Sequence, residues 1–237
     1  MGTNNQALII STSKLPGFDQ MNLDLHYLEE TFNRAEILFT LRFYFWEGDW
    51  LSLGYHQKSI PANWEKLSKE GHIKIVMRPS GGGAVLHSGG ITYALTFKKN
   101  SYNRFSYETV NNWLIQSLSK LGLNLEKGNL KKSTIKDHCF GSSYICDLVD
   151  EFGFKRVGSA QYRKNGVFLQ HGEIQLNPCR ELWKELFEEE APPQVKLNRS
   201  NDEIINYLKG RFIEGKPNLK IQNINCKYSD IKNLLKN

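Results

Sequence analysis

Hydrophobic positions recur at helical spacing in several parts of the chain. Met21, Leu25 and Leu28 fall on one side of a helix predicted over residues 20–32, with Asp19 as a candidate N-cap. The same spacing predicts further helices at Ala62–Glu70, Tyr107–Leu121, Arg180–Glu190, Asp202–Phe212 and Ser229–Lys236.

Extended segments lie between these helices, in short runs of β-branched and aromatic residues bounded by turn residues. Two strands are predicted in residues 41–57, a buried strand at Ile73–Met77, and further strands at Ala84–Leu86 and Ile91–Phe97. The mixture predicts an α/β chain of the α+β type, with a mixed, mainly antiparallel sheet flanked by helices.

The strongest local signal is a hairpin. The segments Phe154–Lys164 and Val167–Leu176 flank Asn165-Gly166, a dipeptide typical of two-residue type I′ turns. This turn fixes the facing pairs as Ala160 with His171, Ser159 with Gly172 and Gly158 with Glu173. Because such small side chains are unusual inside a strand, we expect another group to approach the backbone there.

Length and composition are those of a globular protein, with 237 residues of which 40% are hydrophobic and 24% charged. The length exceeds a typical domain of about 150 residues, which favours one large domain with an appendage. We place the main domain at residues 1–193 and a small helical appendage, packed on it, at residues 194–237.

Several classes of partner are disfavoured. No apolar run approaches the ~18 residues that span a bilayer, and the N-terminus lacks a signal-peptide pattern. The four cysteines form no CxxC pair, which predicts reduced thiols, a cytoplasmic protein and no metal site. The net charge is +6, but the basic residues are scattered and match no nucleic-acid-binding motif. We therefore expect neither nucleic acid nor membrane, and an acidic protein fits the charge.

A glycine-rich loop is the first candidate for chemistry. It reads Arg78-Pro79-Ser80-Gly81-Gly82-Gly83-Ala84 and joins two predicted strands. Successive glycines expose backbone N–H groups, so a polar ligand can lie directly on the main chain. The structural alternative is a flexible hairpin loop.

Cys139 and Lys155 are the second candidate pair, because a neighbouring cation raises the thiolate fraction of a cysteine. A buried, inert cysteine is the structural alternative, and Cys146 has nearly the same claim. The hairpin register puts His171 on the opposite sheet face from Lys155, so we leave His171 out of the catalytic prediction. It and His87 are then read as structural histidines.

Four segments, in order from about residue 20 to residue 177, together resemble one family. They are QMNLDLHYLEE, LRFYFWEGDWLSLGYHQ, MRPSGGGAVLHSGGITYAL and KRVGSAQYRKNGVFLQHGEIQL. They resemble the lipoate-protein ligase and octanoyltransferase superfamily, which shares its catalytic fold with biotin ligases. The resemblance therefore implies the biotin/lipoyl protein ligase catalytic-domain fold.

The family contains two chemistries. Lipoate ligases activate a free acid with ATP and Mg²⁺, whereas cysteine-dependent octanoyltransferases take the acyl group from acyl carrier protein and need no cofactor. Cys139-Phe140 and the run AVLHSGGITYAL resemble the transferases, while the loop around Ser80 is ligase-like. We expect the transferase, with the ligase as the alternative and a non-catalytic carrier-protein binder as a third hypothesis.

The resemblance also implies roles for residues and partners. Cys139 would be the nucleophile and Lys155 would orient the carbonyl and stabilise negative charge. The expected donor is octanoyl-acyl carrier protein, and the acceptors are lipoyl domains of glycine cleavage H protein or dehydrogenase E2 subunits. The expected substrate-binding residues are Arg78, Ser80, Gly81, Gly82, Gly83, Ala84, His87, Gly158, Ser159 and Ala160.

Overall fold

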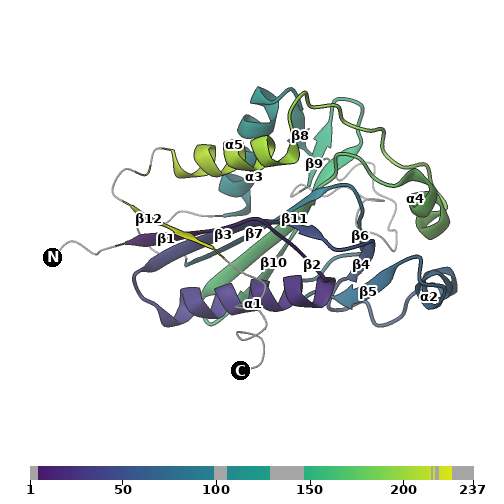
Figure 1. Cartoon of the computed structure of the whole chain (residues 1–237), viewed down its shortest axis with the longest axis horizontal. Helices are drawn as coiled ribbons and strands as arrows, with labels where there is room; N and C mark the ends of the chain where they lie inside the picture. Colours follow the sequence, from purple (N-terminus) through teal and green to yellow (C-terminus); the bar gives the residue numbers. More distant parts are fainter. Residues whose placement is uncertain (1–4, 99–105, 129–146, 215, 217–218, 226–237) are drawn as a thin grey trace.

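The computed structural model describes residues 5–98, 106–128, 147–214, 216 and 219–225. Its largest element is a nine-stranded sheet (Figure 1) made of β1 (Gln6–Ile10), β2 (Ser13–Leu15), β3 (Ile37–Trp46), β7 (Ile91–Lys98), β8 (Leu125–Lys127), β9 (Leu148–Asp150), β10 (Lys155–Lys164), β11 (Val167–Ile174) and β12 (Lys220–Ile224). The order is β12-β1-β3-β7-β11-β10-β9-β8, with β2 beside β3. Pairs from β3 to β8 are antiparallel and those of β12, β1 and β2 are parallel. The predicted sheet type is confirmed.

Helices cover both faces of this sheet, as predicted. On one face, α1 (Gly17–Asn33) packs against β3, β7 and β11. On the other, α3 (Tyr107–Lys120) packs against α5 (Asn201–Ile213), as Figure 1 shows. Trp113 and Phe212 join these two helices, with ring centroids 4.7 Å apart.

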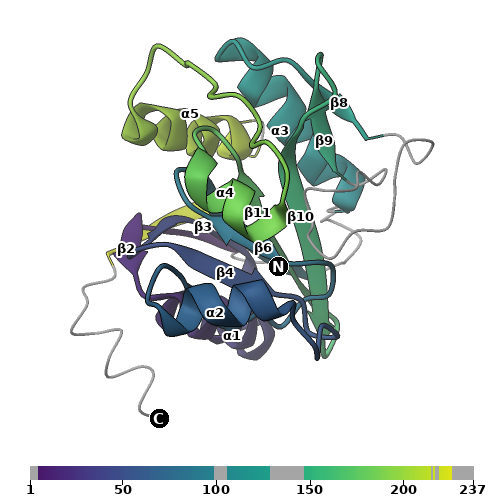
Figure 2. The same cartoon turned by 90° about the vertical axis from the view of Figure 1, so that its right-hand side faces the viewer.

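A second, three-stranded sheet has the order β5-β4-β6 and lies at one end of the large sheet. Its strands are β5 (Lys74–Met77), β4 (Trp50–Leu53) and β6 (Val85–His87). The helices α2 (Ala62–Lys69) and α4 (Arg180–Phe187) pack together beside it (Figure 2), and Trp64 Nε1 donates to the Leu186 carbonyl at 2.6 Å. The glycine-rich loop joins β5 to β6 of this small sheet.

The structure corrects three details of the predicted elements. Pro16 rather than Asp19 precedes α1, because its extended backbone leads straight into the first turn, where Asp19 lies. Met77 is 48% exposed, because β5 is an edge strand rather than a buried one. Strand β12 stands where only helices were predicted, since its pairing with distant β1 has no local signal. The helix predicted at Ser229–Lys236 lies outside the described residues.

The hairpin register is confirmed at all three predicted pairs, Ala160 with His171, Ser159 with Gly172 and Gly158 with Glu173. Asn165 and Gly166 both have positive φ, as a type I′ turn requires. The described helices include none that is both long and apolar enough to cross a membrane. The division of the chain after residue 193 stays a prediction, although α5 shares its apolar core with α3.

Replacing Leu208 with Ala should lower the free energy of unfolding by about 2–5 kcal/mol. Leu208 is fully buried in the core between α5 and α3, so the shorter side chain leaves a cavity. Urea denaturation measures the change, with Asn206→Ala on the exposed side of α5 as the matched control. Equal stability of the two variants would show that α5 is not integral to the core.

Candidate active site

A narrow cavity of about 30 Å³ lies where the two sheets meet. Strands β10 and β11 supply one wall, and β3, β4, β6 and β7 supply most of the rest. The lining residues are Met21, Tyr44, Trp46, Ser52, Arg78, Val85, His87, Thr92, Gly158, Ser159, Ala160, His171, Gly172 and Glu173. The small side chains of β10 thus face a cavity, which is what their presence in a strand suggested.

Arg78 holds the glycine-rich loop in a fixed shape. Its guanidinium donates to the carbonyls of Gly81 at 2.8 Å and Gly83 at 2.6 Å, and to that of Ser52 at 2.9 Å. Gly82 has a φ of 94°, which favours glycine. Gly54 packs so closely that an added Cβ would lie 1.9 Å from the Gly82 carbonyl oxygen. The loop is thus fixed by the hydrogen bonds of Arg78 and by close packing against Gly54.

A buried hydrogen-bonded chain connects this loop to α1. Ser80 Oγ lies 2.5 Å from His171 Nε2, and His171 Nδ1 lies 2.9 Å from Asp24 Oδ2. The Asp24 carboxylate also receives Arg42 Nη1 at 2.6 Å and Tyr44 Oη at 3.2 Å. The Arg42 guanidinium therefore balances the charge of Asp24 in a region closed to water.

A second chain of the same kind runs from β4 to β11. Ser52 Oγ lies 2.8 Å from His87 Nε2, and His87 Nδ1 lies 2.8 Å from Glu173 Oε2. Burial lowers the pKa of His87 below its ordinary value of 6.5, although the Glu173 carboxylate opposes this shift. His87 is therefore neutral near pH 7, with Nδ1 donating to Glu173 and Nε2 accepting from Ser52.

Tyrosines brace the small-residue strand from the α3 side. Tyr93 Oη lies 2.7 Å from Ser159 Oγ, and Tyr107 Oη donates to the Ser159 carbonyl at 3.1 Å. Gln170 Nε2 donates to Tyr93 Oη at 3.0 Å. Gly172 has no space for a Cβ, which would lie 2.7 Å from the Gly158 carbonyl oxygen. Strands β10 and β11 are consequently packed closely together, and hydrogen bonds from the tyrosines fix the position of β10.

Lys155 stands apart from this cavity. Its Nζ lies 2.7 Å from Asp147 Oδ2, and both side chains are only 3% exposed. Lys155 does not line the narrow cavity, whereas His171 does. Cys139 and Cys146 lie outside the described residues.

The other predicted binding residues divide into two groups. Arg78, His87 and residues 158–160 line the cavity, whereas Ser80 and residues 81–84 are not among its lining residues. His171 and Glu173 also line the cavity, although neither is among the site residues predicted from the sequence. Their predicted pairing with Ala160 and Gly158 was the available signal, because paired residues share a sheet face. In the described part of the chain, no cluster of three or more His, Cys, Asp or Glu side chains could hold a metal ion.

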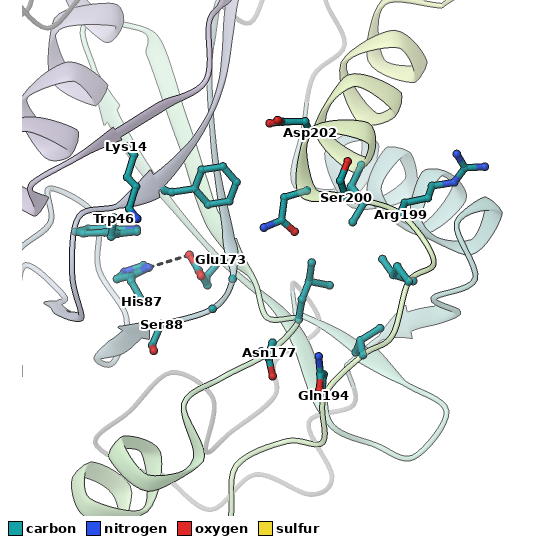
Figure 3. Close-up of a pocket in the computed structure, with 18 of the residues that line it drawn as sticks. Lys14, Trp46, His87, Ser88, Glu173, Asn177, Gln194, Arg199, Ser200 and Asp202 are labelled. Carbon is teal, nitrogen blue, oxygen red and sulfur yellow. Dashed lines mark hydrogen bonds and ion pairs between the residues drawn. The ribbon is translucent and has the colours of Figure 1, made fainter.

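A much larger cleft, of about 980 Å³, adjoins this cavity (Figure 3). Lys14 and Trp46 lie on one side of it, and Arg199, Ser200 and Asp202 lie on the other. Residues 194–200, which lead into α5, and Asn201, Asp202 and Ile204 at the start of α5 form most of the second side.

The architecture is that of lipoate-protein ligases. A protein from T. acidophilum described as a lipoate protein ligase with bound lipoic acid superposes with a TM-score of 0.71, covering 98% of this chain and 93% of that one at 21% identity. Lipoate-protein ligase A bound with ATP gives a TM-score of 0.65 at 20% identity, covering 98% and 93% of the two chains. These likenesses concern the fold.

The chain belongs to the lipoyl protein ligase A/B catalytic domain family, whose model matches residues 16–208. Curated relatives are named octanoyltransferase LipM. The one from Kyrpidia tusciae is 37% identical over 159 residues, which are 61% of this chain and 57% of that protein. The one from Anoxybacillus flavithermus is 32% identical over 216 residues, or 84% and 76% of the two proteins. The resemblance inferred from the four sequence segments is confirmed.

Acidification below about pH 6.5 should destabilise the protein through His87. The folded-state pKa of His87 is lowered, so the unfolded chain binds the additional proton first as the pH falls. Protonation of this one group lowers the free energy of unfolding by at most about 1.4 kcal/mol per pH unit. Urea denaturation from about pH 7.5 to about pH 5 should show a shallower dependence for His87→Asn than for the native chain. Identical slopes would contradict the assignment.

Proposed function

We propose that this chain transfers an octanoyl group from an acyl carrier protein thioester to a lysine of a lipoyl carrier domain. The observation that carries the proposal is the narrow cavity walled by Gly158, Ser159 and Ala160 in a chain of this family. The relatives named octanoyltransferase support the reaction type. The first of them is matched over little more than half its length.

The proposed reaction has two steps. The Cys139 thiolate attacks the thioester carbonyl, a new C–S bond forms while the C–S bond to the carrier breaks, and the departing carrier thiolate takes up the proton that the Cys139 thiol released. The amine of the acceptor lysine then attacks the acyl-enzyme, forming an amide and releasing Cys139. Thioester exchange is nearly thermoneutral and aminolysis runs downhill, so this route needs no ATP.

Lys155 is the proposed stabiliser of the charge that develops on the carbonyl oxygen. Its Nζ is buried in an ion pair with Asp147, which limits the movement of the side chain. A cation held in place before the reaction pays little reorganisation cost when the oxyanion forms. Cys139 and Lys155 thus retain the roles that the family resemblance gives them.

The ATP-dependent ligase remains the alternative, and the ligase-like loop Arg78–Gly83 is the observation that favours it. In that reaction a free acid is first converted to an adenylate, which requires ATP and Mg²⁺. Cys139 would then be dispensable. Replacing Cys139 therefore distinguishes the two reactions, because only the transferase requires its thiol.

Incubation with octanoyl-acyl carrier protein should add one octanoyl group to the native chain, detected by intact-protein mass spectrometry. The adduct should be labile to hydroxylamine, absent from Cys139→Ala and retained in the matched control Cys146→Ala. Transfer to a lipoyl domain should fall on the order of a thousandfold or more in Cys139→Ala.

The absence of an adduct on every variant, with a fully acylated donor, would overturn the thioester route. Lipoate-dependent exchange between ATP and pyrophosphate would then establish the ligase alternative. Binding of the carrier without either reaction would indicate a non-catalytic binder.

A further inference from the structure

The turn between β9 and β10 presents an aromatic side chain to solvent. This turn comprises residues 151–154, and its Phe152 is 77% exposed, the largest exposed fraction of any large apolar side chain in the described part of the chain. Figures 1 and 2 show β9 on the side of the molecule remote from α1. Single exposed apolar side chains are common on protein surfaces, so the significance of this one depends on how the turn is built.

A buried carboxylate fixes the shape of the turn. Asp150 Oδ1 accepts the backbone N–H groups of Phe152 at 3.0 Å and of Phe154 at 2.9 Å. The backbone carbonyl of Asp150 accepts the N–H of Gly153 at 2.9 Å, and Gly153 has a φ of 83°, which favours glycine. Three consecutive N–H groups of the turn are therefore bound to one residue.

Arg156 holds Asp150 from the other side. Its Nε donates to Asp150 Oδ2 at 2.6 Å, and its Nη1 donates to the Pro193 carbonyl at 2.7 Å. Asp150 and Arg156 are both buried, and breaking a buried ion pair is costly, so Phe152 projects from a rigid support. An aromatic side chain on such a support loses little conformational entropy when a partner protein covers it.

The turn lies beside the chemistry that the proposed function assigns to this chain. Phe152 is three residues from Lys155, a separation of at most about 11 Å. The acceptor amine stands on a lysine side chain, which reaches only a short distance beyond the domain that carries it. That domain must therefore approach the surface around Lys155 closely, whereas an acyl carrier protein delivers its thioester on a longer flexible arm.

The charge next to Phe152 also distinguishes the two partners. Glu151 is exposed, and its carboxylate forms no ion pair or hydrogen bond with the residues that the structure describes. An exposed carboxylate attracts the ammonium group of a lysine before that group loses its proton, and it repels an acidic carrier protein. The turn thus fits the lysine-bearing acceptor better than the donor.

Resting on the proposed function, we propose that the β9–β10 turn is the docking point for the lysine-bearing domain, with Phe152 as its anchor. Phe152 packs against apolar surface of that domain beside the acceptor lysine, and Glu151 attracts the lysine toward the site. Phe152 does not touch the octanoyl group. It therefore acts on recognition of the acceptor and leaves the bond-forming steps unchanged.

The test loads the chain with octanoyl-acyl carrier protein, removes the donor, and then measures transfer from the octanoyl-enzyme at increasing concentrations of acceptor. H protein and an E2 lipoyl domain are both assayed, and the better acceptor is used. In Phe152→Ala the half-saturating concentration of this domain should rise about tenfold or more, while the rate at saturation stays within about twofold of the native rate. Phe152→Leu, which keeps an apolar side chain, should have a smaller effect.

Three controls accompany this variant. Phe32→Ala is the matched one, because Phe32 is also an exposed aromatic residue but lies on α1, and it should keep the native half-saturating concentration. Glu151→Gln should raise that concentration no more than about fivefold, since an exposed charge pair contributes little. Transfer to butylamine, which has no docking surface, should be equally fast in Phe152→Ala and in the native chain.

An unchanged half-saturating concentration in Phe152→Ala, with a native thermal denaturation midpoint, overturns the proposal, and so does an equal increase in Phe32→Ala. Slower transfer to butylamine would show that Phe152 acts on the chemical step, which also overturns it. A weaker response to octanoyl-acyl carrier protein in the loading step would make the turn a docking point for the donor and would overturn it as well.

Calorimetric titration with the unmodified domain separates this proposal from the proposed function, because binding requires no octanoyl group. Weaker binding of the domain to Phe152→Ala, in a chain that forms no adduct on Cys139, keeps the docking point and rejects the cysteine route. Adduct formation together with binding that is insensitive to Phe152 keeps the transferase and rejects the docking point.

Discussion

A carboxylate withdrawn from water must be met by hydrogen-bond donors, and in this molecule that requirement ties separate elements together. Asp24 on α1 receives Arg42 from β3 and His171 from β11. Glu173 on β11 receives His87 from the small sheet and Thr92 from β7. Apolar packing tolerates small slips between layers, whereas these bonds allow only one arrangement. The bond between His87 and Glu173 joins the two sheets, and the bonds of Asp24 join α1 to the large sheet.

The two faces of β10 have different roles in the site. On the α3 side, Tyr93 and Tyr107 fix the hydroxyl and the carbonyl of Ser159. On the other side, Gly158 and Ala160 present almost no side chain, which leaves room for a ligand against the backbone. A strand with little side-chain packing of its own thus acquires its rigidity from its neighbours.

The parts of the site that depend on short-range sequence signals could be predicted from the sequence. Asn165-Gly166 set the hairpin register, and that register already placed Glu173 opposite Gly158. Its function as a wall was not predictable, because Trp46, His87 and Thr92 come from three other strands whose pairing has no short-range signal. Strand β12 escaped prediction for the same reason, since its partner lies at the opposite end of the chain.

Charged and polar residues around a cavity do not by themselves call for a polar ligand. The donors of Arg78 engage carbonyls of the glycine-rich loop, and both nitrogens of His87 engage other side chains. Glu173 Oε2 accepts hydrogen bonds from His87 and Thr92. What remains for a ligand is largely ring faces, methylene groups and glycine backbone. Because the polar atoms already satisfy one another, such a lining behaves as an apolar wall toward an unbranched chain.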